Sequence, residues 1–413
     1  MSLIGPEAKD NSQAYKSPLG TNYWKLWVAS TIAALGTGIR STAIPLLAAN
    51  LTNDSFKISL VIVAEHLPVI LFALVSGVLV DKFDRKLLMW KINLFRTLLV
   101  GIFTILLLID FSSIELLISM AFILGCTWTL FGTASQSILP SIVKKNDLNR
   151  ANSKLVTGSI VTEEFIAPPL AAGLFVMGAW IPFGLDTAAF ALSGILIFSL
   201  TGDFKIQPTN KGENIKEKIK EGIIWLWKDK LLRNLCIMAG TFAFFSTATL
   251  SVEVLYVLQI LGISQAGYGF LLVTIAIGSL LGSFLANYLD RIFSTRIVLI
   301  ISITSAAIPS IIIGLTSNPY VAGPMFLFFG LSMALWNIIV ISLRQSMVPE
   351  HMLSRVNSAY KLVSGITAPT GALFGGVVGS VFGLRYPFIL GGLLLILIGI
   401  ITMRNVSTKS ISH

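Results

Sequence analysis

Charged side chains are scarce in this chain. Only 12% of its 413 residues are Asp, Glu, Lys or Arg, whereas 54% are hydrophobic and the mean hydropathy is +0.83. A soluble globular protein carries roughly 25% charged residues. Half that share cannot cover a water-facing surface of this size, which excludes an ordinary soluble protein and indicates a surface that faces lipid.

Cysteine and histidine are also scarce, with two and three residues. Cys126 and Cys236 lie far apart in or beside apolar runs, so we expect no disulfide, no metal site and no cofactor. The chain lacks the G-x-x-x-x-G-K-[ST] phosphate loop and the G-x-S-x-G hydrolase motif. We therefore expect no ATP-driven transport and no enzyme, with a membrane-embedded lipid-modifying enzyme as the alternative.

Long apolar runs dominate what is present. A helix of about 20 apolar residues crosses a bilayer, and twelve segments qualify, which predicts an all-α membrane protein. The segments are Tyr23–Ala48, Phe56–Val80, Leu87–Ile109, Ile114–Ile138, Asn152–Met177, Ile181–Leu200, Leu232–Leu258, Ala266–Leu289, Arg296–Thr316, Pro319–Leu343, Arg355–Val381 and Tyr386–Met403.

Positive charge predicts the orientation of these spans. With the N-terminus in the cytoplasm, all of the 30 Lys and Arg except Arg40, Lys57 and Arg385 fall in cytoplasmic loops or helix ends. We expect both termini in the cytoplasm and, because Met1–Asn22 is polar, no cleavable signal peptide. The net charge of +10 is spread over short loops, so we expect a lipid bilayer and no nucleic acid as partner.

One connection differs from the others. Thr201–Leu231 is polar and rich in Lys, and its apolar residues recur at helical spacing from Ile215 to Trp227. This pattern predicts an amphipathic helix on the cytoplasmic surface, with a regulatory or partner-binding helix as the alternative. The predicted organisation is a tail at 1–22, a six-helix half at 23–200, a linker at 201–231, a second half at 232–403 and a tail at 404–413.

The two halves share sequence. Three blocks recur in the same order: Gln136–Pro140 matches Gln345–Pro349, Leu148–Ser153 matches Leu353–Ser358, and Lys154–Gly158 matches Lys361–Gly365. Parallel repeats about an axis along the membrane normal are a known transporter design. The substrate path is then expected between the halves, near mid-membrane.

The loop Gly77–Lys86, which reads GVLVDKFDRK, resembles the signature of the major facilitator superfamily between its second and third helices. That signature usually has a second glycine where Asp84 stands. Further stretches are similar to the bacterial twelve-helix exporters of macrolides, other drugs and siderophores; they are Glu163–Gly173, Pro182–Phe190, Glu221–Arg233, Leu335–Ser358 and Ser354–Gly376. The resemblance implies a monomeric secondary transporter that exports its substrate with proton entry as the driving force.

The signature loop supplies a candidate cytoplasmic gate. Asp81 lies at the cytoplasmic end of the second helix and can pair with Arg85 or Lys86, while Gly77 allows a close helix approach. The repeat places the pair Asp290 and Arg291 opposite, with no glycine at the position matching Gly77. The alternative is a charged turn that only marks topology.

Two adjacent acids, Glu163 and Glu164, are predicted near mid-bilayer on the fifth helix. An unpaired ionised acid is costly there, which favours a role in proton coupling for at least one of them. Adjacent helical residues point about 100° apart, so one acid can face the cavity and the other a neighbouring helix. Pro168 and Pro169 follow and predict a hinge. The alternative is a structural acid bonded to another helix.

Arg40 and Glu65 are predicted at equal depth on the first two helices, so an ion pair between them is expected. Arg40 is a candidate for the substrate cavity, with a static ion pair to Glu65 as the alternative. Glu65 and Glu253 are candidates for proton coupling. The alternative for Glu253 is an acid at the membrane interface. Asp186 is expected to cap a helix or bond two helices. His66 could shuttle protons, although a simple hydrogen bond is the more ordinary role.

Aromatic side chains within the spans are candidates to line a hydrophobic cavity. They are Trp128, Phe131, Phe244 and Trp336, and packing toward lipid is the alternative for most of them.

Together these features predict a multi-pass protein of the bacterial inner membrane that exports an amphipathic small molecule, such as an antibiotic or a siderophore, by proton-coupled alternating access. A metabolite importer of the same fold and a non-transporting scaffold or lipid scramblase are the alternatives.

Overall fold

The computed structural model describes residues 19–202, 204 and 215–404, and for parts of some helices, including Gly77 and Asp81, it describes the backbone alone. Within these residues the chain is helical and has no strand. Ten of its helices are long and apolar enough to cross a membrane, and two shorter apolar stretches cover 365–381 and 386–402. Each predicted span therefore has a helix, and the all-α prediction is confirmed.

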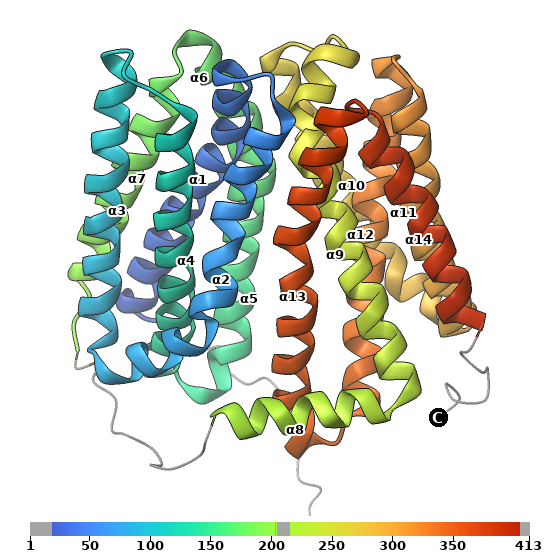
Figure 1. Ribbon diagram of the computed structural model, residues 1–413. Helices are drawn as coiled ribbons and strands as arrows, with labels where there is room; N and C mark the ends of the chain where they lie inside the picture. Colours follow the sequence, from blue (N-terminus) through green and yellow to red (C-terminus); the bar gives the residue numbers. More distant parts are fainter. Residues whose placement is uncertain (1–18, 203, 205–214, 405–413) are drawn as a thin grey trace, which may run out of the picture.

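The helices form two groups that stand side by side (Figure 1). The first group comprises α1 (Thr21–Leu51), α2 (Ser55–Lys82), α3 (Arg85–Leu108), α4 (Ile114–Ile142), the continuous run α5 (Leu148–Ile160), η2 (Val161–Ile166) and α6 (Ala167–Met177), and α7 (Trp180–Phe198). A short 3-10 turn, η1 (Lys145–Asp147), precedes α5.

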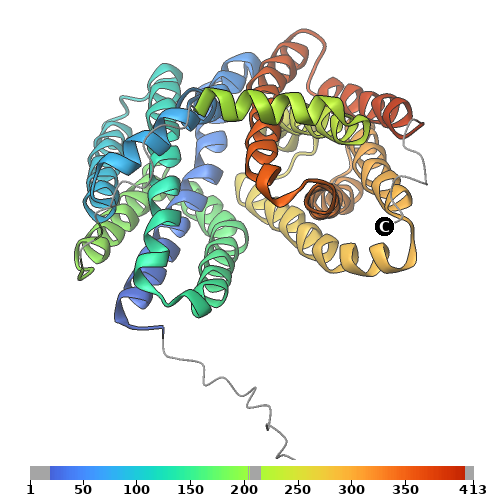
Figure 2. The same ribbon diagram turned by 90° about the horizontal axis from the view of Figure 1, so that it is seen from below.

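The second group comprises α9 (Lys230–Leu255) with η3 (Tyr256–Ile260), α10 (Gln265–Ile292), α11 (Thr295–Leu315), α12 (Pro319–Met347), α13 (Glu350–Val381) and α14 (Tyr386–Arg404). The connecting helix α8 (Ile215–Lys228) lies across the lower end of this group and packs against α13 and α9 (Figures 1 and 2). The exact limits of the halves and the linker remain a prediction.

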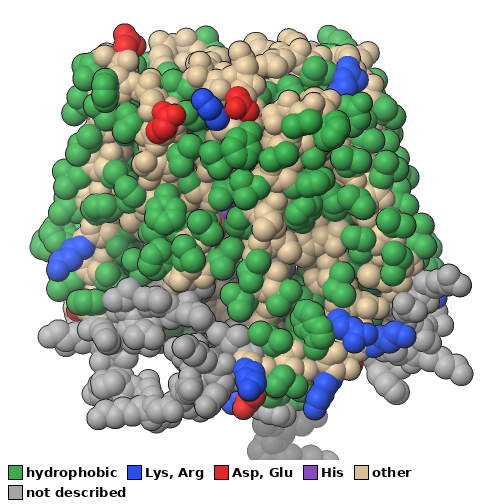
Figure 3. Space-filling model, in the orientation of Figure 1, with side chains coloured by type: hydrophobic (Ala, Val, Ile, Leu, Met, Phe, Trp, Pro, Cys, Tyr) green, Lys and Arg blue, Asp and Glu red, His purple; other side chains and the backbone are tan. Residues whose placement is uncertain are grey.

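The outer surface is apolar around the middle of the molecule (Figure 3). Leu98, Ile102 and Ile105 on α3 and Phe284 on α10 are more than half exposed in the absence of lipid. Charged side chains in this view gather near the upper and lower rims. Because a helix satisfies its own backbone hydrogen bonds, such a surface is stable in hydrocarbon.

The two groups meet at one end, where α1 connects to α2. The Ser55 hydroxyl donates to the carbonyl of Gly376 at 3.0 Å, and the amides of Gln259 and Gln265 donate to Asn53 and Asn50 at 3.0 and 2.8 Å. Here α2 packs on α13, and α6 packs on α10. This end is opposite to α8 (Figure 1).

Close approach of α13 to α2 requires glycine at position 376. A Cβ placed on Gly376 would lie 2.4 Å from Ser59 Cβ and 3.0 Å from the carbonyl oxygen of Ser55. No side chain fits there unless the two helices move apart.

We expect Gly376→Ala to lower the melting temperature of the purified protein, because overpacking costs about 1–3 kcal/mol and outweighs the roughly 1 kcal/mol that alanine gains in a helix. Gly323→Ala on α12 is the matched control, since nothing lies within 4 Å of its added Cβ. Equal melting temperatures for the two variants would contradict the contact.

Candidate functional site

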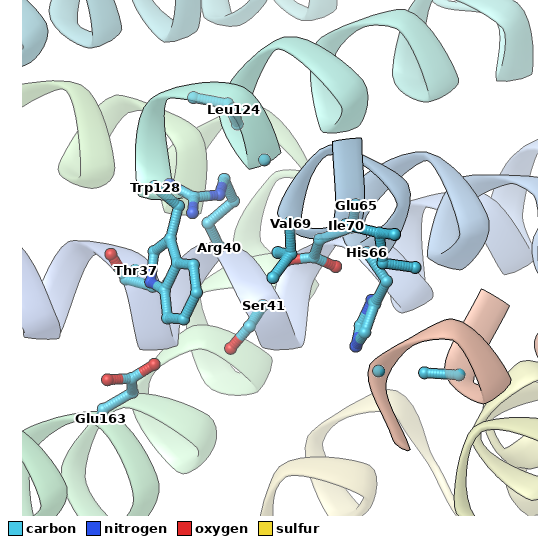
Figure 4. A pocket seen from close by; sticks show the side chains of 13 residues that line it. Thr37, Arg40, Ser41, Glu65, His66, Val69, Ile70, Leu124, Trp128 and Glu163 are labelled. Atoms are coloured by element: carbon cyan, nitrogen blue, oxygen red, sulfur yellow. The ribbon is translucent and has the colours of Figure 1, made fainter. Parts of the chain in front are cut away.

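A central cavity of about 360 Å³ lies between the two groups of helices. It is bordered by α1, α2, α4 and η2 of the first group and by α13 of the second (Figure 4). Its lining consists of Thr37, Arg40, Ser41, Glu65, His66, Val69, Ile70, Leu124, Gly125, Trp128, Glu163, Gly365 and Ala368. An apolar wall with a few converging polar groups is the usual composition of a small-molecule site.

Glycines bring the acid-bearing helices to the cavity. A Cβ on Gly38 of α1 would lie 2.6 Å from the carbonyl oxygen of Glu163, and a Cβ on Gly125 of α4 would lie 2.5 Å from that of Glu65. Small residues at helix interfaces permit such backbone contact in membranes. The positions of both acids therefore depend on a glycine in the facing helix.

Arg40 pairs with Asp186 of α7 and not with Glu65, so the expected Arg40–Glu65 ion pair is wrong. Arg40 Nη1 lies 2.9 Å from Asp186 Oδ2, and the two side chains are 6% and 0% exposed. A long helical side chain points back over the turn before it. For Arg40 that turn contains Gly36, whose added Cβ would lie 2.5 Å from Asp186 Oδ1. The prediction that Asp186 bonds two helices agrees with this geometry.

A second buried arginine, Arg96 of α3, shares the ring of Phe190 with Arg40. Its Nε donates to the hydroxyl of Thr127 at 2.9 Å, and its guanidinium carbon lies 5.0 Å and 5.1 Å from the ring centres of Phe131 and Phe190. Arg40 contacts the ring of Phe190 as well, at 5.6 Å. The two arginines, the buried ring of Phe190 and the half-buried ring of Phe131 thus form a stack next to Asp186.

The sequence reasoning missed Arg96 by counting it among the cytoplasmic helix ends. It is the twelfth residue of α3, about 17 Å along the helix at 1.5 Å per residue, and it is 3% exposed. Counting depth from Arg85 would have placed it in the membrane interior.

Glu163 and Glu164 occupy η2, a π-helical turn between α5 and α6. Glu163 lines the cavity, whereas Glu164 is exposed and does not. Pro168 and Pro169 stand in the first turn of α6, directly after this turn. The carbonyl of Pro168 touches α10, where a Cβ on Gly269 would lie 2.6 Å from it. The predicted hinge therefore coincides with a π turn, a local helix irregularity that is frequent at functional sites.

The remaining acids and His66 differ in their surroundings. Glu65 lines the cavity beside His66, whose Nδ1 lies 3.1 Å from the carbonyl oxygen of Ile62 in the same helix. Glu253 is 6% exposed, does not line the cavity, and bonds to the hydroxyl of Tyr268 on α10. Its other oxygen, Oε1, has no hydrogen-bond partner among the described residues.

Trp128 is the one predicted cavity aromatic that lines the cavity, and it is 55% exposed. Phe131 packs on Arg96, Phe244 packs on Phe245 and Phe374, and Trp336 stacks on Phe242 at 6.0 Å. These three rings are placed outside the cavity lining because they fill space between helices of one group.

The predicted gate is only partly described, because the structure describes the backbone alone for Gly77 and Asp81. Lys86 donates to the carbonyl of Leu200 at 2.6 Å, next to the end of α7, and Arg85 begins α3. Asp84, where the signature usually has glycine, caps α3 by accepting from the amide of Leu87 at 2.9 Å. Asp290 and Arg291 are exposed near the end of α10.

We expect Asp186→Ala to destabilise the protein by about 3–5 kcal/mol, because it leaves the Arg40 guanidinium buried without its anion. The double change Arg40→Leu with Asp186→Ala removes both charges and should restore part of the loss. Melting temperatures of wild type, both single variants and the double variant form the test. If the losses of stability of the two single variants add up to the loss of the double variant, the two side chains do not interact.

The sequence matches the family described as transmembrane secretion effector over residues 14–411. It is 26% identical to the MFS-type transporter YfiS of Bacillus subtilis (strain 168), over 92% of this chain and 91% of the relative. It is 22% identical to the multidrug efflux pump Tap of Mycolicibacterium fortuitum (91% and 93% covered) and 22% identical to the enterobactin exporter EntS of Escherichia coli O1:K1 / APEC (90% and 90%).

Solved structures share the fold. A mutant of the nucleoside transporter NupG superposes with a TM-score of 0.78 at 12% identity, covering 93% of this chain and 99% of that one. A bacterial homologue of the iron transporter ferroportin, in its inward-facing state, superposes with a TM-score of 0.71 at 18% identity, covering 94% of this chain and 100% of that one. The chain is a non-enzymatic, multi-pass membrane transporter for small molecules, and it belongs to the transmembrane secretion effector family of the major facilitator superfamily.

Proposed function

We propose that this transporter exports an amphipathic small molecule from the cytoplasm of a bacterium across its inner membrane, in exchange for protons. The observation that carries this proposal is the carboxyl group of Glu163, which faces a cavity between the two halves. The efflux pump Tap and the exporter EntS, among its relatives, support the direction.

Glu163 is the proposed proton carrier. A carboxyl group in a membrane interior alternates between a neutral form that tolerates low dielectric and a charged form that needs water or a partner. No Lys, Arg or His of the described residues lies within 4.0 Å of the Glu163 or Glu65 carboxyl groups. Glu163 is therefore available to take up and release a proton as its exposure to water changes.

Alternating access follows from where the halves touch. With the N-terminus in the cytoplasm, as the Lys and Arg distribution favours, the contacts at Ser55, Asn53 and Asn50 close the outer side. We infer that the structure represents a state that is closed on the outer side. Separation of α2 from α13 and of α6 from α10 would open the outer side, with η2 and the Pro168–Pro169 pair as the bending point and the Asp81 to Lys86 turn as the cytoplasmic closure.

The test uses inside-out membrane vesicles that contain the protein and have an acidic lumen. We expect at least one of three fluorescent probes, neutral Nile red, cationic ethidium or anionic fluorescein, to accumulate, and nigericin to abolish the accumulation by collapsing the pH gradient. Two results would contradict proton-coupled export. Either no probe accumulates, or nigericin fails to reduce the accumulation of every probe that does.

In the same vesicles we expect Glu163→Gln to abolish gradient-driven accumulation, because glutamine cannot exchange a proton. Glu164→Gln is the matched control and should transport like the wild type, since Glu164 does not line the cavity. If Glu164→Gln abolishes accumulation and Glu163→Gln does not, the proton carrier is Glu164. If Glu163→Gln accumulates the probe like the wild type, Glu163 is not the proton carrier.

A further inference from the structure

We infer that the cavity selects an amphipathic organic cation, held between the carboxylates of Glu65 and Glu163 against the face of Trp128. This inference rests on the proposed export function and adds the charge class of the substrate. It depends on the charges that line the cavity, on how each is already paired, and on the apolar surface between them.

Arg40 already has an anionic partner. Its guanidinium bonds Asp186 at 2.9 Å and lies over the ring of Phe190. The other buried arginine, Arg96, lies over the same Phe190 ring and is absent from the cavity lining. An anion entering the cavity would have to displace Asp186 from a dry ion pair, which is unfavourable.

The two carboxylates have no such partner. Glu65 on α2 and Glu163 on η2 point into the cavity from different sides, and neither has a cationic side chain of the described residues within 4.0 Å. Counted together with Arg40, Arg96 and Asp186, these two acids leave the region with one net negative charge when all are ionised. In a site of low dielectric this attracts a cation and repels an anion.

The surface between the acids suits the rest of such a molecule. The indole of Trp128 lines the same cavity as the two acids and is 55% exposed (Figure 4). Val69, Ile70 and Leu124 supply an apolar wall. Tryptophan is the strongest cation–π partner among the side chains, and the contact gains strength when desolvated. Charge, aromatic face and apolar wall together fit an organic cation with flat hydrophobic groups.

Protons and the cation then compete for Glu163. The charged or titratable groups near it are Arg40 on α1, Glu65 and His66 on α2, and Glu164 on η2 itself. The two basic residues of α5, which also packs on η2, lie nine or more residues earlier in the chain and have other partners, Asp147 and the Trp24 ring. The Asp and Arg residues of α10, the helix of the other half that packs on η2, lie at the far end of that helix, and α6 has none. Protonation of Glu163 removes one negative charge, so cation affinity should rise as the pH rises.

The probes are tetraphenylphosphonium and tetraphenylborate, which share shape and hydrophobicity and differ in the sign of their charge. Equilibrium dialysis with the purified, detergent-solubilised protein measures each, with empty micelles as the blank. We expect tetraphenylphosphonium to bind above the blank, more tightly at pH 8 than at pH 6, and tetraphenylborate to match the blank.

Removing the counter-charges should weaken cation binding. We expect Glu163→Gln and Glu65→Gln each to raise the dissociation constant about tenfold, the loss of one close charge pair, and Glu163→Gln also to flatten the pH dependence. Glu164→Gln should bind like the wild type. Melting temperature and a monodisperse elution profile verify that each variant is folded.

Three results would overturn the inference. The first is specific binding of tetraphenylborate, and the second is no binding of tetraphenylphosphonium. The third is equal tetraphenylphosphonium binding by the wild type and by the double variant Glu65→Gln, Glu163→Gln. If the vesicles show proton-coupled flux of neutral or anionic probes alone, export stands and the cation site fails. If the cation binds as expected but no probe is transported, the site stands and the export function fails.

Discussion

The buried ion pair between Arg40 and Asp186 is the interaction on which the cavity depends. A charge in the membrane interior is stable only when it is paired or hydrated, and this pair is nearly dry, with side-chain exposures of 6% and 0%. It holds α1 against α7 and gives Arg40, the one cationic side chain among the described lining residues, an anionic partner. Without Asp186, the cavity would present an unpaired arginine beside its two acids, which would weaken the proposed attraction for cations.

Close helix contacts set the geometry around this pair. Gly36, Gly38 and Gly125 each allow a backbone or a carboxylate of the facing helix to come within 2.6 Å of where a Cβ would stand. Apolar helices gain little from hydrophobic burial in a bilayer, because lipid is as apolar as their side chains, so such contacts carry much of the packing. The same principle operates between the halves at Gly376 and Gly269, where the contact is proposed to break during transport.

The proposed mechanism links one π turn to one titratable group. Glu163 lies on a π turn that precedes two prolines, and the carbonyl of Pro168 rests on α10 of the other half. A change in the separation of the halves therefore acts on the same turn that holds the proposed proton carrier. In the proposed mechanism, protonation of Glu163 would act on the contact between the halves through fewer than ten residues of chain.

The sequence alone determined the number and type of the spans, the resemblance between the halves and the family, because hydropathy, repeated blocks and the Gly77–Lys86 signature are properties of the chain. It also identified Arg40, Glu65, Glu163 and Trp128 as cavity candidates. It did not determine that Arg40 binds Asp186, that Glu163 rather than Glu164 lines the cavity, or that Arg96 is buried. These depend on how each helix is rotated about its axis, at about 100° per residue. Helices that are apolar on every side carry little sequence signal for that rotation, since lipid and protein interior are equally apolar; the glycine contacts of the tertiary structure decide it.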